Sequence, residues 1–333
     1  MRKLYFLLPG TTGKFGGGGL WAELNTCNLA QQICEAEIVT YRQREEQHPF
    51  LTDILLACDP KSVIFVIGWG FDVPKIINQL RRQNVIYHAH STNYSFVLPS
   101  QVPIITVSRN TMGYWGEKAA NSLIYYLPNQ ISDEFRHLDQ PRDIDILVQT
   151  RKSSTYLLKQ LIPALQSLYQ VEMITSYVGD LAGLFNRSKI YLYDSAEYWA
   201  TSRVTEGFGL PPLEALACGC QVFSSLNHGL SDYLDPGFNC YKIASYSLEY
   251  DLQRIHQALQ TPNKPNKSLE SLVAQYRSDH LIAKLELILT EINHFFDVRS
   301  QYSANIKSLN KRRISQLKIA KIMSKLRQKL KRN

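Results

Sequence analysis

The segment from Thr205 to Cys220 holds the residues whose types and spacing are best suited to chemistry. Glu206 precedes a Gly-x-Gly loop whose backbone amides can reach a ligand, and Glu214 follows eight positions later. Between them two prolines begin a short helix, because the first helical turn does not need the N–H groups that proline lacks. A helix N-terminus favours an anionic group. The segment therefore predicts a site in which the two carboxylates bind two parts of one ligand. An anionic group of that ligand would lie between them, at the helix N-terminus.

A second candidate is the glycine run from Gly16 to Gly19, which follows the apolar stretch Lys3–Leu8. Glycine lets the backbone approach a ligand closely, and the helix expected after the run offers its N-terminus to an anion. We predict that Gly16, Gly17 and Gly18 line the ligand. The spacing is not that of a Walker A phosphate loop, and a flexible loop is the alternative interpretation.

His88 and His90 lie at the end of a predicted strand, where residues two apart face the same side. Two histidines without carboxylate or cysteine neighbours make a poor zinc site. We expect them to line a cleft and to hydrogen-bond a polar ligand, with a purely structural role as the alternative. Asp143 and Asp145 form a nominal D-x-D pattern, but at the start of a strand rather than at its ligand-facing end. No metal site is predicted.

Short apolar runs alternate with helical patterns and are continuously apolar, which is typical of strands buried on both faces of a parallel sheet. The predicted strands are Lys3–Leu8, Ser62–Ile67, Val85–His88, Ile104–Val107, Asp145–Gln149, Ile190–Tyr193 and Gln221–Ser224. The predicted helices are Leu20–Cys34, Val73–Gln83, Tyr156–Leu168, Leu213–Cys218, Ser268–Arg277 and Asp279–Phe296. This alternation predicts a doubly wound α/β protein.

A polar stretch bounded by Pro128 and Arg142 separates the first set of strands from the second, and we interpret it as a domain boundary. A Gly-, Pro- and Asn-rich stretch then follows the last predicted strand up to about Lys267. The predicted units are a first Rossmann-like domain over 1–128, a second over 129–267, helices that pack back on the body over 268–300, and a tail over 301–333.

The chain of 333 residues is 44% apolar and 20% charged, a globular composition. Its net charge of +8 comes from residues 301–333, which contain eleven basic side chains and no acidic one. The first 300 residues hold 26 basic and 29 acidic side chains, a net charge of −3, which disfavours a body that binds nucleic acid. Six scattered cysteines predict reduced thiols. No apolar run approaches the roughly 20 residues of a membrane span. We expect a cytoplasmic protein.

Apolar residues in the tail fall on one face of a helix, with lysines clustered away from it. The apolar residues are Ile319, Ile322, Met323, Leu326 and Leu330. This pattern predicts an interfacial helix on an anionic membrane surface, and so a peripheral position on the inner face of a membrane. Earlier apolar positions fall on a different face, which predicts a break near Lys318. A solvated extension is the alternative, and contact with nucleic acid is disfavoured because no aromatic residues interleave the charges.

The sequence from Glu206 to Gly219, EGFGLPPLEALACG, closely resembles the E-x7-E motif of the retaining glycosyltransferases of family 4, within the glycosyl transferases group 1. The glycine run, His90 and Ser108 at strand ends, and Pro128-Asn129 at an interdomain hinge are also similar to the family's pattern. Asp232 departs from it, because the family usually has Glu there. The resemblance covers about residues 1–296 and implies a GT-B fold, in which two Rossmann-like domains face a cleft.

The resemblance also implies a role for each matching residue. Glu206 and His90 would be catalytic, contacting the donor sugar. The donor would further be bound by the amides of Gly207, Phe208, Gly209 and Leu210 and by Glu214, which would accept a hydrogen bond from the nucleotide ribose. Arg151 and Lys152 follow a predicted strand and would neutralise the diphosphate. Further candidates are His88, Ser108 and Asn129.

We therefore predict a metal-independent, retaining glycosyltransferase that moves a sugar from a nucleoside-diphosphate sugar to an acceptor, which is a glycan, a lipid or a small molecule. Cations, loop amides and helix N-termini would stabilise the leaving diphosphate without a cofactor. One alternative is a GT-B nucleotide-sugar epimerase. Another is an inactive protein that binds sugar nucleotides or is tethered to a membrane for protein interactions. The presence of both Glu206 and Glu214 favours an active enzyme.

Overall fold

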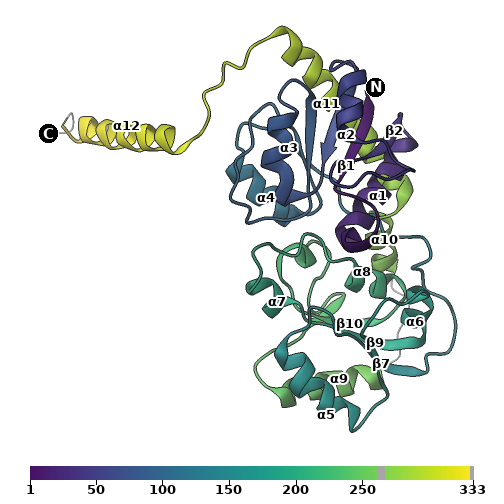
Figure 1. Ribbon diagram of the computed structural model, residues 1–333. Coiled ribbons are helices and arrows are strands. Elements are labelled where there is room, and N and C mark those ends of the chain that lie inside the picture. Colours follow the sequence, from purple (N-terminus) through teal and green to yellow (C-terminus); the bar gives the residue numbers. More distant parts are fainter. Residues whose placement is uncertain (262–266, 331–333) are drawn as a thin grey trace.

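The computed structural model describes residues 1–261 and 267–330, and the chain forms two α/β domains stacked one above the other (Figure 1). The first sheet has the strand order β2-β1-β3-β4-β5-β6 and the second β11-β10-β9-β7-β8. The pairings are all parallel. The strands of the first sheet are β1 (Lys3–Leu8), β2 (Ala36–Thr40), β3 (Val63–Ile67), β4 (Asn84–Ala89), β5 (Ile104–Thr106) and β6 (Ile124–Tyr126). Those of the second are β7 (Ile144–Gln149), β8 (Val171–Ile174), β9 (Ser188–Tyr193), β10 (Gln221–Ser224) and β11 (Cys240–Lys242).

Helices cover both faces of each sheet, which confirms the predicted doubly wound α/β fold (Figure 1). The α-helices are α1 (Gly18–Gln31), α2 (Leu51–Ala57), α3 (Val73–Gln79), α4 (Arg109–Lys118), α5 (Ile162–Gln166), α6 (Leu181–Arg187), α7 (Ala196–Ala200), α8 (Leu210–Ala217), α9 (Leu248–Gln260), α10 (Lys267–Ala274), α11 (Ser278–Gln301) and α12 (Lys311–Leu330). Shorter helical turns are η1 (Gly13–Phe15), η2 (Gly70–Asp72), η3 (Leu157–Leu161), which is π-helical, and η4 (His228–Asp232).

The strand side chains alternate between two apolar layers in each domain. In the first domain, Leu4 and Phe6 of β1 pack toward α1 and α11, whereas Tyr5 and Leu7 pack on the opposite face with α2, α3 and α4. In the second domain, Leu147 lies in the layer of α6, α8 and α10, and its neighbours in β7 lie in the layer of α5 and α9. The central strands therefore have both faces in the core, which is why their sequences are continuously apolar.

The last helices of the body join the two domains. Val273 and Tyr276 close the core beneath α8 in the second domain, while α11 returns to the first domain and packs along its sheet. One side of α11 is buried there, through Leu281, Leu285, Ile288, Leu289, Ile292 and Phe296. The body therefore includes a helix that follows the second domain in sequence and belongs to the core of the first.

Within the tail, Lys311–Leu330 form one helix, α12, which extends away from the body (Figure 1). It runs unbroken through Lys318, so the predicted break at that residue is wrong. Arg2 and Arg299 hold the end of α11 to the body, and the tail begins after it. Residues 331–333, the end of the predicted tail, lie outside the described residues. No helix within 1–261 and 267–330 is long and apolar enough to cross a membrane.

Several elements differ from the sequence-based predictions. The stretch between Ser224 and Lys267, in which no helix was predicted, contains η4, β11 and α9. The predicted helix Val73–Gln83 ends at Gln79, and Tyr156–Leu168 is a π-helical turn followed by α5. The predicted limit at 267 adjoins residues 262–266, which lie outside the described residues, and the domain limits stay predictions. The six cysteines are free thiols.

Leu285 on α11 tests whether this helix is part of the first domain's core. The side chain of Leu285 is 2% exposed, whereas Leu287 on the same helix is 74% exposed. We expect Leu285→Ala to lower the free energy of unfolding by about 2–5 kcal/mol, because the truncation leaves a cavity. Leu287→Ala is the matched control and should change it by less than about 0.5 kcal/mol. Urea denaturation measures both, and equal effects of the two variants would contradict this packing.

Candidate active site

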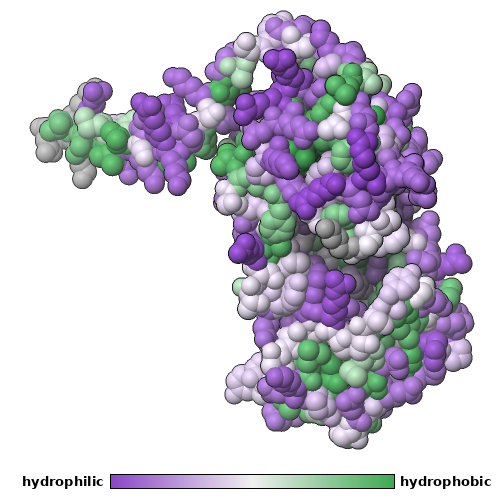
Figure 2. Space-filling view, viewed as in Figure 1, coloured by the Kyte–Doolittle hydropathy of each residue, from purple (hydrophilic) through white to green (hydrophobic). Residues whose placement is uncertain are grey.

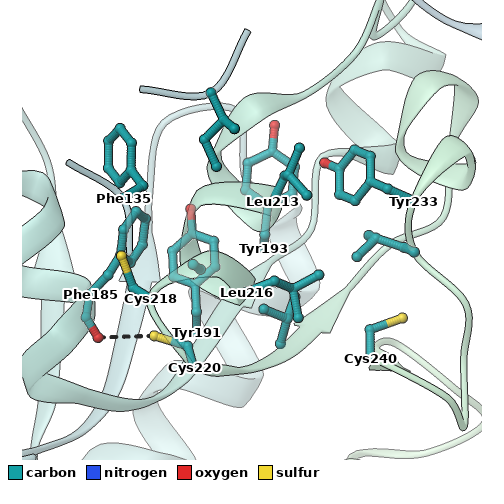
Figure 3. Close-up of a cluster of buried hydrophobic side chains, with 14 of the residues drawn as sticks. Phe135, Phe185, Tyr191, Tyr193, Leu213, Leu216, Cys218, Cys220, Tyr233 and Cys240 are labelled. Carbon is teal, nitrogen blue, oxygen red and sulfur yellow. Dashed lines mark hydrogen bonds between the residues drawn. The ribbon is translucent and has the colours of Figure 1, made fainter. Parts of the chain in front are cut away.

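Glu206 is 7% exposed, and its carboxylate is held by three donors from β9, from the residues after it and from α7. Its Oε2 accepts from the Tyr193 hydroxyl (2.9 Å), the Ser195 hydroxyl (3.3 Å) and the indole N–H of Trp199 (2.5 Å). Tyr193 is the last residue of β9 and belongs to the buried cluster that includes the apolar side of α8 (Figure 3). Three hydrogen bonds to one oxygen fix the carboxylate in place, with its negative charge at the carboxyl edge of the second sheet.

The Gly-x-Gly loop after Glu206 packs too closely for side chains. A Cβ at Gly207 would lie 1.7 Å from the backbone oxygen of His90, in the first domain. Gly209 has φ +79°, and a Cβ there would lie 2.4 Å from the side chain of Leu230. Gly209 is also the N-cap of α8. The glycines therefore let the loop lie against the first domain and turn directly into a helix N-terminus.

Reciprocal hydrogen bonds join the two domains beside Glu206. The Ser91 hydroxyl accepts from the backbone N–H of Thr205 (2.9 Å) and donates to its backbone oxygen (2.8 Å). The hydroxyls of Thr92 and Thr205 are 2.8 Å apart. Because Ser91 and Thr92 follow His90 directly, these bonds set the position of His90 relative to Glu206. The structure thus brings together the two residues predicted to be catalytic.

Glu23 of α1 binds both predicted histidines. Its Oε1 lies 3.1 Å from His88 Nδ1 and 2.8 Å from His90 Nε2. Burial opposes ionisation of Glu23, but the two imidazoles outweigh it and hold its pKa at about 2. Burial lowers the pKa of His90, followed by the effect of His88, although Glu23 opposes this. His88 is buried, whereas the side chain of His90 is 16% exposed. His90 is therefore the member of the group that can reach a ligand.

The carboxylate beside the histidines changes the sequence-based argument about metals. Glu23, His88 and His90 each offer a ligand atom, and these atoms lie within 4.8 Å of one another. These residue types are ones that bind transition metals. The same Glu23 oxygen already accepts from both rings, while Glu23 Oε2 and His88 Nε2 are buried without a partner among the described residues. Asp143 and Asp145 are paired instead with Arg187 and Lys189, at 2.5 and 2.7 Å.

The two predicted phosphate cations follow β7, at the carboxyl edge of the second sheet. Arg151 is exposed and Lys152 is half-buried. Lys152 adopts φ +67°, and its Nζ lies 4.4 Å from the centroid of the Trp199 ring. Burial lowers the pKa of Lys152, while the charge of Glu206 opposes that change. Lys152 is therefore within electrostatic reach of Glu206, and Arg151 is open to solvent beside it.

Glu214 lies on α8 and is half-buried, and its side-chain carboxyl makes no hydrogen bond or ion pair with the described residues. Burial, with a smaller contribution from Glu134, raises the pKa of Glu214 to about 8. Oε2 of the first carboxylate thus accepts three hydrogen bonds, whereas the carboxyl of Glu214 has no partner among the described residues. A ligand hydroxyl could form the hydrogen bond that the carboxyl of Glu214 lacks in the protein.

A family model described as Glycosyl transferases group 1 matches residues 129–290 of this chain. These residues form a glycosyl transferases group 1 domain. The match includes the whole segment from Glu206 to Glu214 and both cations after β7. The predicted resemblance to the glycosyl transferases group 1 is therefore confirmed for residues 129–290. No curated protein is a significant match to the sequence.

Solved structures confirm the GT-B fold. Sucrose-phosphate synthase from Thermosynechococcus elongatus has a TM-score of 0.60 at 12% identity, over 88% of this chain and 99% of that one. A glycosyltransferase from Rickettsia africae has a TM-score of 0.63 at 12% identity, over 87% and 98%. HepE from Anabaena, solved in complex with UDP, has a TM-score of 0.61 at 14% identity, over 87% and 100%. At these identities the likeness concerns the fold alone.

The remaining sequence candidates have varied surroundings. Ser108 is fully buried and caps α4 through a reciprocal pair with Thr111. The ring of Phe208 lies in the core against Tyr233 and Tyr276, so only its amide is available to a ligand. Among the described residues, Asn129 Oδ1 is buried without a partner. Gly16 and Gly18 are exposed, Gly17 caps α1, and Leu210 begins α8.

Sequence reasoning missed the residues that hold the predicted ones in place. Glu23, Tyr193 and Trp199 are brought to the site by tertiary packing, and no local pattern marks them. Ser195 could have been found, because it follows the carboxyl end of a predicted strand, where α/β sheets bind ligands. Asp232, which replaces the family's usual Glu, accepts from the backbone N–H of Arg109 at 2.7 Å and so binds the first turn of α4 across the domain junction.

Glu214 gives a pH-dependent test of the site. Because its folded-state pKa is about 8 and its ordinary value is 4.5, the folded protein keeps a proton that the unfolded chain loses between these values. The stability from this proton is present below about pH 4.5 and is lost as the pH rises through 8. Glu214→Gln should therefore raise Tm relative to wild type at pH 8–9 and leave it nearly unchanged at pH 5.

Differential scanning fluorimetry from pH 5 to pH 9 measures this difference. Glu117→Gln, at an exposed position of α4, is the control and should follow wild type at every pH. If Glu214→Gln also followed wild type throughout, the carboxyl of Glu214 would be ionised and solvated in the folded protein.

Proposed function

We propose that this glycosyltransferase moves a sugar from a nucleoside-diphosphate sugar to an acceptor with retention of configuration and without a metal ion. The observation that carries the proposal is the placement of Glu206. Its fixed carboxylate lies beside a glycine loop, a helix N-terminus and Lys152, and the loop touches His90 of the opposite domain. A donor between these groups would meet a carboxylate near its sugar and cations near its diphosphate.

Departure of a nucleoside diphosphate places negative charge on phosphate oxygens. Arg151 and Lys152 supply positive charge at the carboxyl edge of the second sheet. The amides at the start of α8 add fixed dipoles, which stabilise the developing charge without reorganisation. In this proposal the carboxyl of Glu214 accepts a hydrogen bond from a ribose hydroxyl and so gains the partner that the protein does not provide. These groups suffice to stabilise the leaving group without a metal.

The surroundings of Glu206 also bear on retention. An oxygen that accepts three hydrogen bonds is a weaker nucleophile, because its lone pairs are already engaged. We infer that Glu206 stabilises positive charge near the reacting carbon rather than forming a covalent bond to it. Attack of the acceptor on the face that the diphosphate leaves would then give retention through an oxocarbenium-like state. His90 would approach the donor sugar from the first domain.

The likeness to HepE suggests which donor to test first. HepE has been solved in complex with UDP and with UDP-glucose. The UDP-glucose complex matches this chain with a TM-score of 0.53 at 12% identity. Base and sugar specificity depend on pocket shape, so UDP-, GDP- and ADP-sugars form the starting panel. A bound donor stabilises the protein by mass action, and a thermal-shift screen identifies it.

Glu206→Gln should lower kcat by about 100-fold or more with the donor that the screen selects, because a fixed charge near the reacting carbon is lost. Glu206→Ala should abolish transfer. Both variants should remain folded, because Glu206 lies in a loop outside the strands and helices, and circular dichroism checks this. Release of nucleoside diphosphate measures turnover, with and without EDTA, which should leave the rate unchanged.

Glu172→Gln, at an exposed position of β8, is the control and should match wild type. Undiminished turnover by Glu206→Ala would overturn the assignment of this residue. Formation of an altered free sugar without an acceptor would indicate an epimerase. A donor that binds but is never consumed, even with glycan and lipid acceptors present, would indicate a binding protein.

We further propose that α12 holds the enzyme on an anionic membrane. The apolar stripe of α12 is exposed, with Ile319, Ile322 and Leu326 at 61%, 59% and 51%. No acidic residue occurs in the tail, and the projecting helix shows both charged and apolar residues on its surface (Figure 2). Burial of the stripe in a lipid interface and attraction of the lysines to anionic headgroups would act together.

Full-length protein should co-sediment with vesicles that contain phosphatidylglycerol and not with vesicles of phosphatidylcholine alone. High salt should weaken the binding, because surface electrostatics are screened. A 1–300 chain and the full-length Lys318→Gln/Lys321→Gln/Lys325→Gln variant should both lose it while keeping the wild-type Tm. Binding that survives in the 1–300 chain would refute this role of the tail, as would a preference for RNA over vesicles.

A further inference from the structure

The short helix α7 is anchored to the loop that carries the two phosphate cations. The Glu197 carboxylate accepts from the backbone N–H of Thr155 (2.7 Å) and from its hydroxyl (2.6 Å). One residue before Thr155, the Ser154 hydroxyl donates to Asp194 (2.6 Å), the residue that directly follows β9. These bonds hold α7, which follows β9, beside the segment that follows β7. The side chains of α7 are therefore positioned relative to Lys152, although Trp199 and Lys152 are 47 positions apart in sequence.

Trp199 of α7 contacts both charged groups of the proposed donor site. Its indole N–H donates to Glu206 Oε2 at 2.5 Å, while the Lys152 ammonium lies 4.4 Å from the ring centroid. An indole suits both contacts, because its N–H is a hydrogen-bond donor and its ring face attracts cations. Tyr198 packs edge-on against Trp199 at 5.0 Å and lies farther from the ammonium, at 5.7 Å. One ring thus binds a carboxylate at its edge and an ammonium at its face.

The ring also keeps the two charges apart. Lys152 and Glu206 are close enough to influence each other electrostatically, yet they form no ion pair among the described residues. Direct pairing would neutralise the two groups that the reaction needs, one at the sugar and one at the diphosphate. The left-handed backbone of Lys152, with φ +67°, is costly for a residue with a side chain, and such strain is commonly found at functional sites.

We propose that Trp199 is a positioning residue that holds Glu206 and Lys152 at a fixed separation, so that both stay available to the donor. The inference rests on the proposed function and adds a residue to it. As the glycosidic bond breaks, positive charge develops on the sugar and negative charge on the diphosphate. Trp199 sets the distance between the two protein charges that meet them. It does not itself touch the reacting atoms.

Two substitutions separate the two contacts. Trp199→Phe keeps an aromatic face for Lys152 but removes the N–H. It should lower kcat about 10- to 100-fold, the value of a hydrogen bond to a charged group. The affinity for UDP and the donor KM should stay within about threefold of wild type, because the cation–π contact remains. Trp199→Leu removes both contacts and should lower kcat similarly and weaken UDP binding about tenfold.

Tyr198→Phe, on the same helix, is the matched control and should match wild type in all three quantities. Isothermal calorimetry with UDP gives the affinity independently of turnover, and steady-state kinetics with UDP-glucose gives kcat and KM. The inference fails if Trp199→Phe keeps wild-type kcat, or if Trp199→Leu binds UDP as tightly as Trp199→Phe does. If wild type neither binds UDP nor consumes UDP-glucose, the same measurements are made with the nucleotide and donor that the panel selects. Wild-type inactivity with every donor would refute the proposed function instead.

Discussion

The interlocking of Ser91 with Thr205 is the contact on which the arrangement of the site depends. One hydroxyl satisfies both the N–H and the carbonyl oxygen of Thr205, at 2.9 and 2.8 Å, and so joins the end of β4 to the residue before Glu206. Gly207 then lies against the backbone of His90 with no space for a side chain. Each sheet alone presents only one half of a ligand site at its carboxyl edge. These few buried contacts hold the carboxyl edges of the two sheets against each other. A donor that spans the two edges would meet groups from both domains.

The charged residues at this junction follow one physical rule, which is that a buried charge must be given partners. Glu206 receives three donors, and Glu23 lies between two imidazoles. The partners also decide what each residue can do. Glu23 orients His90 through the contact with Nε2, and the side chain of His90 stays partly exposed. The cost of burying these carboxylates is thus offset by bonds that also fix the geometry of the site.

The sequence was informative wherever local chemistry determines structure. The central strands, buried on both faces, were predicted to within a few residues, and the segment around Glu206 was readable because its glycines, prolines and carboxylates are adjacent in sequence. The missed strands β2, β6, β8 and β11 are short or carry polar residues, as in Val171–Ile174 with Glu172 at its exposed edge. Glu23 and Trp199 could not be predicted, because each acts through a contact with a residue that only the fold brings near. The tail's break at Lys318 was wrongly predicted because a change of apolar face constrains only a packed helix, and α12 is exposed.

The two glutamates of the E-x7-E segment differ in their hydrogen bonding, and the difference follows from their positions. Glu206 lies in the loop, where side chains from β9 and α7 can converge on it. Glu214 lies beyond the first turn of α8, where the free amides of that helix are, and burial raises its pKa to about 8. The hydrogen bonds to Glu206 are therefore formed before any ligand binds, whereas the carboxyl of Glu214 would gain a hydrogen bond only from a bound ligand. In the proposed reaction the sugar end of the donor meets a preorganised charge, and the ribose end supplies a hydrogen bond that the protein lacks. Donor binding would then shift the proton equilibrium of Glu214 toward the carboxylate, because a ribose hydroxyl that donates to it favours the ionised form.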